Sequence, residues 1–172
     1  MLVLVSDASV LIDIEQSDLT SAMFTLPYQF AVPDILFAEE LVERHARLLQ
    51  FGLKIKPMSS ELIAEAYILH QKYPKPSVND LLALILAKHE NSQLLTGDKA
   101  LREVAKIFDV EVHGTIWLVQ QLIQYEKITI EDAQIAFQHM KDSGSRLPWN
   151  EVQKILVKTE ATEIVEQLNN SF

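Results

Sequence analysis

Residues 1–113 alternate between short apolar runs and longer stretches in which apolar residues recur at helical spacing. Short apolar runs are typical of buried strands, whereas apolar residues at positions i, i+3 and i+4 are typical of amphipathic helices. Strands that alternate with helices along a chain build a parallel sheet covered by helices. The pattern therefore predicts an α/β fold in which a parallel β-sheet is sandwiched by α-helices.

The expected elements follow from where the apolar period changes. Strands are expected at Leu2–Val5, Tyr28–Val32, Lys54–Pro57, Gln93–Thr96 and Val110–Val112. Helices are expected at Asp7–Ile14, Leu19–Phe24, Asp34–Phe51, Glu61–Gln71, Leu81–Ala87 and Lys99–Phe108. Because Leu81–Ala87 is apolar on every side, this helix is expected to cross the middle of the fold.

From Gly114 onward the strand pattern stops. Helices are expected at Thr115–Gln124, from a capping box at Thr129 and Asp132 to Lys141, and from Asn150 onward. Residues 1–113 are thus predicted to form the α/β domain, and residues 114–172 an all-helical C-terminal extension. The extension carries more apolar surface than a short tail can bury upon itself, so we expect it to pack on the domain or on a partner subunit, most simply in a homodimer.

Composition limits the kind of site. The 172 residues include no cysteine, which excludes thiolate zinc sites and cysteine nucleophiles, so any metal must be held by oxygen or imidazole. The formal net charge of −9 repels polyanions, but divalent cations reverse that effect where carboxylates gather. No run approaches the ~20 apolar residues of a membrane span, and no signal region is evident. We expect a soluble, cytoplasmic protein that does not enter membranes.

Three acidic residues stand at helix starts. Asp7 and Asp98 each follow a strand and precede a helix, and Asp80 lies in the first turn of the buried helix. Taken singly, each is explained by helix capping or by the helix dipole. Ligands of parallel sheets, however, bind outside the carboxyl ends of the strands, and Asp7 and Asp98 share that edge. The three carboxylates are therefore expected to converge there.

Glu39 lies in the second turn of its helix, where capping does not explain it. At 100° per residue it falls beside the apolar face of that helix, whereas Glu40 falls nearly opposite. We expect Glu39 to face a cleft and Glu40 to face water.

These residues lie in four ordered motifs, Asp7-Ala8-Ser9, Val32 to Leu41, Asn79 to Ala87 and Leu95 to Lys99, which resemble the acidic motifs of PIN domains over residues 1 to 113. The resemblance implies a metal-dependent nuclease, a ribonuclease of the VapC-like toxin type that hydrolyses phosphodiester bonds of single-stranded RNA. Many prokaryotic members are toxins of toxin–antitoxin pairs, so an antitoxin protein is an expected partner.

By the same resemblance, Asp7, Glu39, Asp80 and Asp98 are the catalytic, metal-binding carboxylates, with Ser9 and Thr96 as supporting hydroxyls. Carboxylate and water are the ligands preferred by Mg²⁺ and Mn²⁺, so either ion is the expected cofactor. Lys99, Arg102 and Lys106 share one helix face, which either steers phosphates toward the acids or is simply solvated.

Other enzyme classes fit less well. A dinucleotide-binding enzyme or a P-loop protein needs a glycine-rich turn after the first strand, and none is present. A haloacid dehalogenase-type phosphatase would carry an aspartate where Ser9 stands. A phosphoacceptor receiver domain also gathers acids at strand ends. The main alternative is a noncatalytic PIN-like fold that serves as a binding or scaffold module.

Overall fold

A parallel sheet forms the centre of the molecule. The computed structural model describes residues 1–169, and within them five parallel strands lie in the order β3-β2-β1-β4-β5. The strands are β1 (Leu2–Ser6), β2 (Tyr28–Pro33), β3 (Lys54–Lys56), β4 (Gln93–Leu95) and β5 (Val112–His113). Val5 pairs with Ala31 on one side and with Leu94 on the other, so β1 is the middle strand. The predicted α/β class with a parallel sheet is confirmed.

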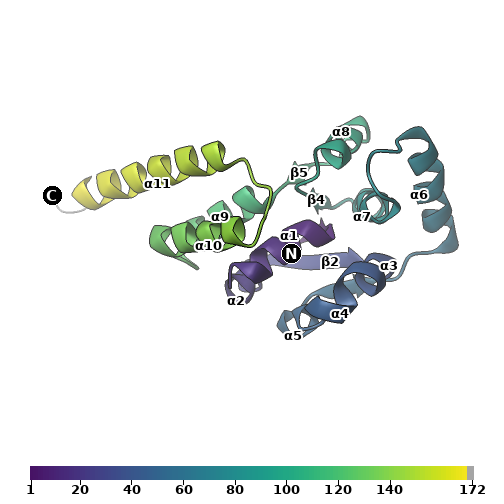
Figure 1. Cartoon of the computed structure of the whole chain (residues 1–172), viewed down its shortest axis with the longest axis horizontal. Coiled ribbons are helices and arrows are strands. Elements are labelled where there is room, and N and C mark those ends of the chain that lie inside the picture. Colours follow the sequence, from purple (N-terminus) through teal and green to yellow (C-terminus); the bar gives the residue numbers. More distant parts are fainter. Residues whose placement is uncertain (170–172) are drawn as a thin grey trace.

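Helices follow the strands and flank the sheet (Figure 1). They include α1 (Ala8–Gln16), α2 (Thr20–Met23), α6 (Ser60–Lys72), α7 (Val78–His89) and α8 (Lys99–Ile107). The residues from Leu81 to Ala87 are all buried, and α7 contacts β1, β2 and β4. The apolar segment therefore crosses the middle of the fold, as its composition predicts.

The single long helix expected at Asp34–Phe51 is wrong. The segment is divided into α3 (Asp34–Leu36), a π-helical turn η1 (Phe37–Leu41), α4 (Val42–His45) and α5 (Leu48–Phe51). A π-turn inserts one residue into the helical period, which a stripe at constant spacing does not reveal. The chain then bends between α4 and α5, where His45 and Arg47 both contact the buried carboxylate of Glu15 on α1.

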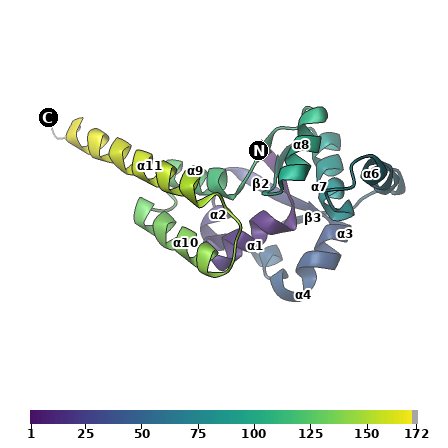
Figure 2. The ribbon, with the colours of Figure 1, turned by 45° about the horizontal axis from the view of Figure 1, so that its top comes forward.

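The C-terminal part is all-helical, as expected. It consists of α9 (Thr115–Gln124), α10 (Ile130–Asp142) and α11 (Trp149–Asn169). The capping box at Thr129 and Asp132 is present at the start of α10. These helices lie together at one end of the molecule, and α11 extends away from the rest (Figures 1 and 2). The predicted boundary between residues 113 and 114 falls at the junction of β5 and α9.

Asp13 on α1 joins this helical part to the α/β part. Its carboxylate accepts a hydrogen bond from the Thr115 hydroxyl at 2.9 Å and another from the Ser145 hydroxyl. Burial raises the pKa of Asp13, and the two hydroxyl donors oppose that rise. One carboxylate thus fixes both the start of α9 and the loop between α10 and α11.

The two halves of α11 differ. Val152 and Leu156 in the first half are buried, whereas Ile164, Val165 and Leu168 in the second half are exposed. Among residues 1–169, no helix is long and apolar enough to cross a membrane.

The burial pattern predicts which truncations the fold tolerates. A chain ending after Val112 loses the fully buried Leu118 and Leu122 of α9, and it leaves their apolar contacts open to water. It should be insoluble or unfolded by circular dichroism, because exposed core surface drives aggregation.

A chain ending after Thr159 is the matched control. It keeps Val152 and Leu156 and loses only residues of α11 that are exposed in the described part of the chain. This chain should remain folded. A soluble, cooperatively folded 1–112 fragment would contradict the packing described here.

Candidate active site

Asp7 and Asp98 lie side by side at the carboxyl edge of the sheet. They follow the neighbouring strands β1 and β4, and the Asp7 amide donates to the carbonyl of Leu95 at 2.9 Å. Each carboxylate also caps the next helix, Asp7 through the Val10 amide at 3.1 Å and Asp98 through the Leu101 amide at 2.7 Å. Both aspartates therefore act as helix caps at the ends of neighbouring strands, and the cap orients each carboxylate at the sheet edge.

Thr96 connects the two aspartates. Its buried hydroxyl donates to Oδ2 of Asp7 and accepts a hydrogen bond from the Asp98 amide at 3.0 Å. Ser9 donates to Oδ1 of Asp7 at 2.8 Å. The structure thus places both predicted supporting hydroxyls in contact with the Asp7 carboxylate, where they fix its orientation.

Asp80 reaches the same edge from the start of α7. Its Oδ2 accepts from the Ser77 amide at 2.9 Å, and the Ser77 hydroxyl accepts from the Asp80 amide at 3.0 Å. This capping box uses one oxygen of the carboxylate. Asp80 is near enough to Asp7 that its negative charge contributes to the raised pKa of Asp7.

The expected division between Glu39 and Glu40 is wrong. Both glutamates are exposed, and the side-chain amide of Asn79 donates to each of them at 2.9 Å. Both belong to the π-turn η1, so the phase of 100° per residue does not apply to them. Asn79 immediately precedes Asp80, which brings both glutamates to the side of the acidic site.

Burial perturbs the carboxylate of Asp7. It is 2% exposed, and burial raises its pKa from the ordinary 3.8 to about 6. Hydrogen bonds from Thr96, Val10 and Ser9 oppose the rise, and the charge of Asp80 adds to it. No cationic side chain in the described part of the chain contributes to this shift. A buried carboxylate beside a second acid is costly to ionise unless a cation accompanies it.

The donor set fits a hard divalent cation in its chemistry. Carboxylate and hydroxyl oxygens surround the edge, and hard cations prefer oxygen ligands. Within residues 1–169, no three acidic or histidine side chains are already close enough to form a metal-binding group. The acids are instead linked in two sets, one through Thr96 and one through Asn79.

Of the three basic residues expected to meet substrate, only Arg102 contacts this site directly. Its Nη2 donates to the Thr96 carbonyl at 2.7 Å. Lys99 and Lys106 are exposed on α8. The structure therefore distinguishes Arg102 from the two lysines. Their shared helical spacing does not make this distinction.

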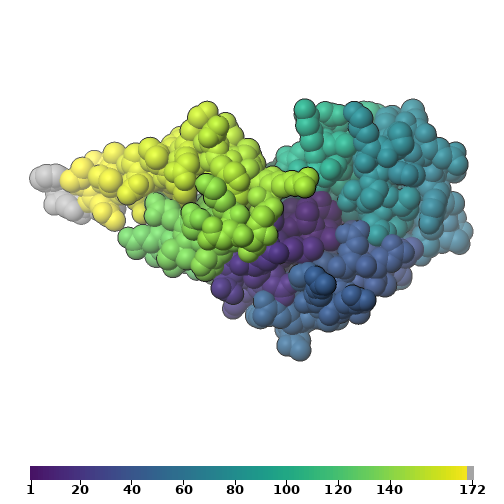
Figure 3. Space-filling model, viewed as in Figure 1, coloured from purple at the N-terminus to yellow at the C-terminus, as the bar shows by residue number. Residues whose placement is uncertain are grey.

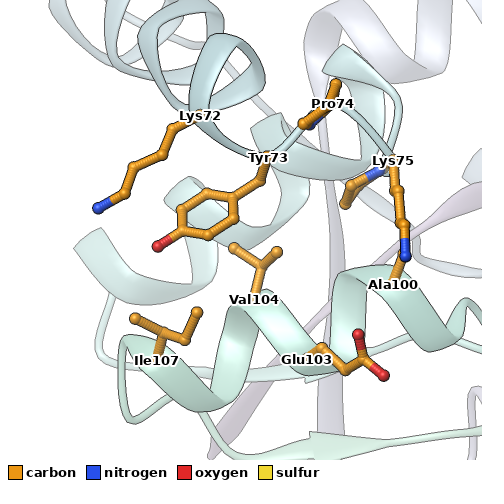
Figure 4. A pocket seen from close by; sticks show the side chains of 9 residues that line it. Lys72, Tyr73, Pro74, Lys75, Ala100, Glu103, Val104 and Ile107 are labelled. Carbon is orange, nitrogen blue, oxygen red and sulfur yellow. The ribbon is translucent and has the colours of Figure 1, made fainter.

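A hollow of about 310 Å³ lies between the loop after α6 and α8 (Figure 4). The ring of Tyr73 and the side chains of Val104 and Ile107 form its walls. The Nζ atom of Lys72 lies 5.3 Å from the centroid of the Tyr73 ring. None of the four predicted acids lines it. This apolar hollow and the acidic edge are separate features of the molecule.

Sequence reasoning did not assign a role to Asn79 or Asp13. Asn79 directly precedes Asp80, and this position is the sequence feature that could have indicated a role at the site. Asp13 acts across more than 100 residues of sequence, because its hydrogen bonds span 102 and 132 residues. No local pattern reveals such contacts.

The fold and these residues together define an α/β protein with a carboxylate site at the edge of a parallel sheet. A family model, DUF3368, described as a PIN domain, matches residues 3–161. The chain therefore belongs to the PIN-domain family, whose members are typically nucleases and usually use divalent metals. The match runs past residue 113 and includes α9, α10 and the first half of α11.

A solved structure, a PilT N-terminus domain protein from the hyperthermophilic archaeon Sulfolobus solfataricus P2, is similar at 14% sequence identity and a TM-score of 0.48. The similarity covers 72% of this chain and 94% of that chain. A search of curated proteins found no match.

The raised pKa of Asp7 predicts the effect of Asp7→Asn on the metal-free protein. Folded Asp7 binds its proton more tightly than an unfolded aspartate, so the free energy of unfolding should fall as pH rises from about 4 to about 6. In EDTA at pH 7, Asp7→Asn should therefore raise that free energy by roughly 1–3 kcal/mol.

Thermal melts at several pH values test this. The variant should lack the loss of stability that the unaltered chain shows across that pH window. Added Mn²⁺ should stabilise the unaltered chain more than the variant. A variant that melts lower at pH 7, with an unchanged pH profile, would contradict the burial argument.

Proposed function

We propose that this protein is a metal-dependent endoribonuclease that hydrolyses phosphodiester bonds of single-stranded RNA. Asp7, Asp80, Asp98 and Glu39 would hold Mg²⁺ or Mn²⁺, and Glu40, held beside Glu39 by Asn79, would add its charge to the site. The observation that carries the proposal is the buried Asp7 carboxylate beside Asp80, with no cationic side chain contributing to its pKa in the described part of the chain. Structures rarely keep such an arrangement without a cation to bind there.

The residues around the acids have distinct tasks in this proposal. Ser9 and Thr96 hold the Asp7 carboxylate in one orientation, which preorganises it for a ligand. Arg102, bound to Thr96, presents a guanidinium next to the acids for a phosphate. When bound, a divalent cation polarises the phosphate and lowers the pKa of a water molecule that attacks it.

The choice of RNA rests on the family resemblance and on the openness of the site. Asp98, Glu39 and Glu40 are exposed, so a polymer strand can reach them without entering a closed pocket. The net charge of −9 means that a polyanion needs a bound cation or local arginines to approach. A noncatalytic module that only binds RNA would not need acidic residues where the RNA makes contact.

Substitution of single carboxylates tests the nuclease proposal. Asp98→Asn keeps the cap on α8 but removes a charge from the site, so Mn²⁺-dependent cleavage of single-stranded RNA should fall at least 100-fold, roughly the scale of losing a preorganised charge contact. Asp109→Asn is the matched control, because Asp109 is an exposed aspartate beyond the other end of α8. Equal activity of both variants would sink the assignment.

The Asn79 contacts predict how the two glutamates behave. Glu39→Gln and Glu40→Gln should each weaken Mn²⁺ binding, measured by isothermal titration calorimetry, and by similar factors, because Asn79 holds both side chains. Loss confined to Glu39→Gln would instead support the division expected from regular helical phase.

Two partners belong to the proposal. The protein would be a toxin whose activity an antitoxin protein masks, which the family resemblance supports. It would also form a homodimer through the second half of α11, where Ile164, Val165 and Leu168 are exposed.

Light scattering tests the dimer. The full chain should have the mass of a dimer, and the chain that ends after Thr159 the mass of a monomer, because it lacks Ile164 and Leu168. Equal oligomeric states of the two chains would remove the second half of α11 from any interface.

A further inference from the structure

A second hollow, of about 430 Å³, lies where the helical extension meets the acidic edge. Gly97 and Arg102 line it on one side, the start of α9 lines it with Trp117, and Arg146 and Glu151 line it from the extension. Figure 3 shows a notch between the beginning of α11 and α8, the two elements that border this hollow. Gly97 lies directly between Thr96 and Asp98, so the hollow adjoins the candidate active site.

Arg102 is held in this hollow by close packing. Its Nη2 donates to the Thr96 carbonyl, and the same nitrogen lies over Gly114, where an added Cβ would be only 2.3 Å away. Any larger residue at Gly114 would displace the guanidinium. Arginine has five N–H donors, and the bond to Thr96 uses one of them. The remaining donors are available to a ligand.

Arg146 is brought to the opposite rim by its neighbour. Ser145 is tied to Asp13 on α1, and Asp13 also holds Thr115 at the start of α9. The loop between α10 and α11 is therefore anchored where it delivers Arg146. The side chain of Arg146 is exposed and forms no ion pair within residues 1–169.

The charges that face the hollow favour an anion. Glu151 is the acidic residue of its lining, and Lys154 pairs with it at 3.3 Å. His113 also lines the hollow; burial lowers its pKa, the contact with Glu111 opposes that shift, and the nearby charge of Arg102 adds to it. The charged residues of the lining are Arg102, Arg146 and Glu151, so the lining itself is net positive in a chain whose net charge is −9.

The aromatic residues here are not free to stack on a base. The Trp117 ring already stacks within the protein, with its centroid 3.9 Å from that of His113 and 5.9 Å from that of Tyr28. Contacts to phosphate carry no base identity. The hollow is therefore suited to the backbone of a nucleic acid rather than to a nucleobase.

We propose that this hollow is a phosphate-binding subsite for the RNA strand, formed jointly by Arg102 of the α/β part and Arg146 of the helical extension. It holds a phosphate next to the one at the acidic edge, and this inference rests on the proposed nuclease function. The extension is then part of the substrate-binding surface, and the subsite accepts any base sequence.

The test measures RNA binding apart from cleavage. A fluorescein-labelled single-stranded RNA is titrated with the full chain carrying Asp98→Asn, in Mg²⁺ and at several salt concentrations, and its anisotropy is read. Adding Arg146→Ala should weaken binding about tenfold, as expected for the loss of one charge-assisted phosphate contact. It should also reduce the slope of log K against log salt by about 0.7. Arg146→Lys should restore part of the affinity.

Lys127→Ala is the control, because it removes the same charge from an exposed residue beyond the far end of α9. It should change neither the affinity nor the slope. Binding of Arg146→Ala equal to that of Lys127→Ala, or no binding of RNA by the Asp98→Asn chain, would overturn the subsite.

The two proposals fail separately. If Arg146→Ala weakens binding but the unaltered chain never cleaves RNA with Mn²⁺, the subsite stands and the nuclease proposal falls. If the unaltered chain cleaves RNA and Arg146→Ala cleaves and binds it as Lys127→Ala does, the nuclease proposal stands and the subsite falls.

Discussion

The hydroxyl of Thr96 is the contact on which the candidate site depends. It donates to Asp7 and accepts from the amide of Asp98, so it joins the ends of β1 and β4, and the Thr96 carbonyl holds Arg102. Neighbouring parallel strands bring their carboxyl ends to one edge by necessity. Through its hydroxyl and its carbonyl, Thr96 fixes the positions of Asp7, Asp98 and the Arg102 guanidinium relative to one another.

The burial of Asp7 gives this arrangement its chemistry. A carboxylate that is costly to ionise makes the metal-free fold less stable near neutral pH, and a cation bound there would remove that cost. The buried Asp7 then lowers the stability of the metal-free fold while it serves the proposed function, a trade-off common at ligand-binding sites. The surrounding apolar core, with α7 buried along most of its length, supplies the stability that tolerates it.

The sequence carried enough information for the class of fold and for the positions of Asp7, Asp80 and Asp98 at helix starts, because strand ends and helix starts leave local patterns. The π-turn at Phe37–Leu41 leaves no local pattern that an analysis at constant helical spacing detects. Such spacing places Glu39 and Glu40 on different helix faces, whereas in the structure both accept a hydrogen bond from Asn79. The contacts of Asp13 were equally out of reach, since they join α1 to residues over 100 positions away. Such contacts follow from tertiary packing and not from any periodic signal.

The helical extension is attached to the α/β part next to the candidate site. Asp13 anchors it, the family match includes most of it, and its loop carries Arg146 to the border of the acidic edge. An extension placed in this way can shape what reaches the acids, whether or not it also pairs with a second copy.

We propose that the carboxylates at the ends of β1 and β4, together with Asp80, hold a divalent cation. An anomalous difference map from crystals soaked in Mn²⁺ tests it most directly. The account predicts a peak within direct ligand distance, about 2 Å, of oxygens of Asp7 and Asp98, with Asp80 and the glutamates on Asn79 directly bound or bound through water. A map with no peak at this edge, or with Mn²⁺ bound elsewhere on the chain, would contradict it.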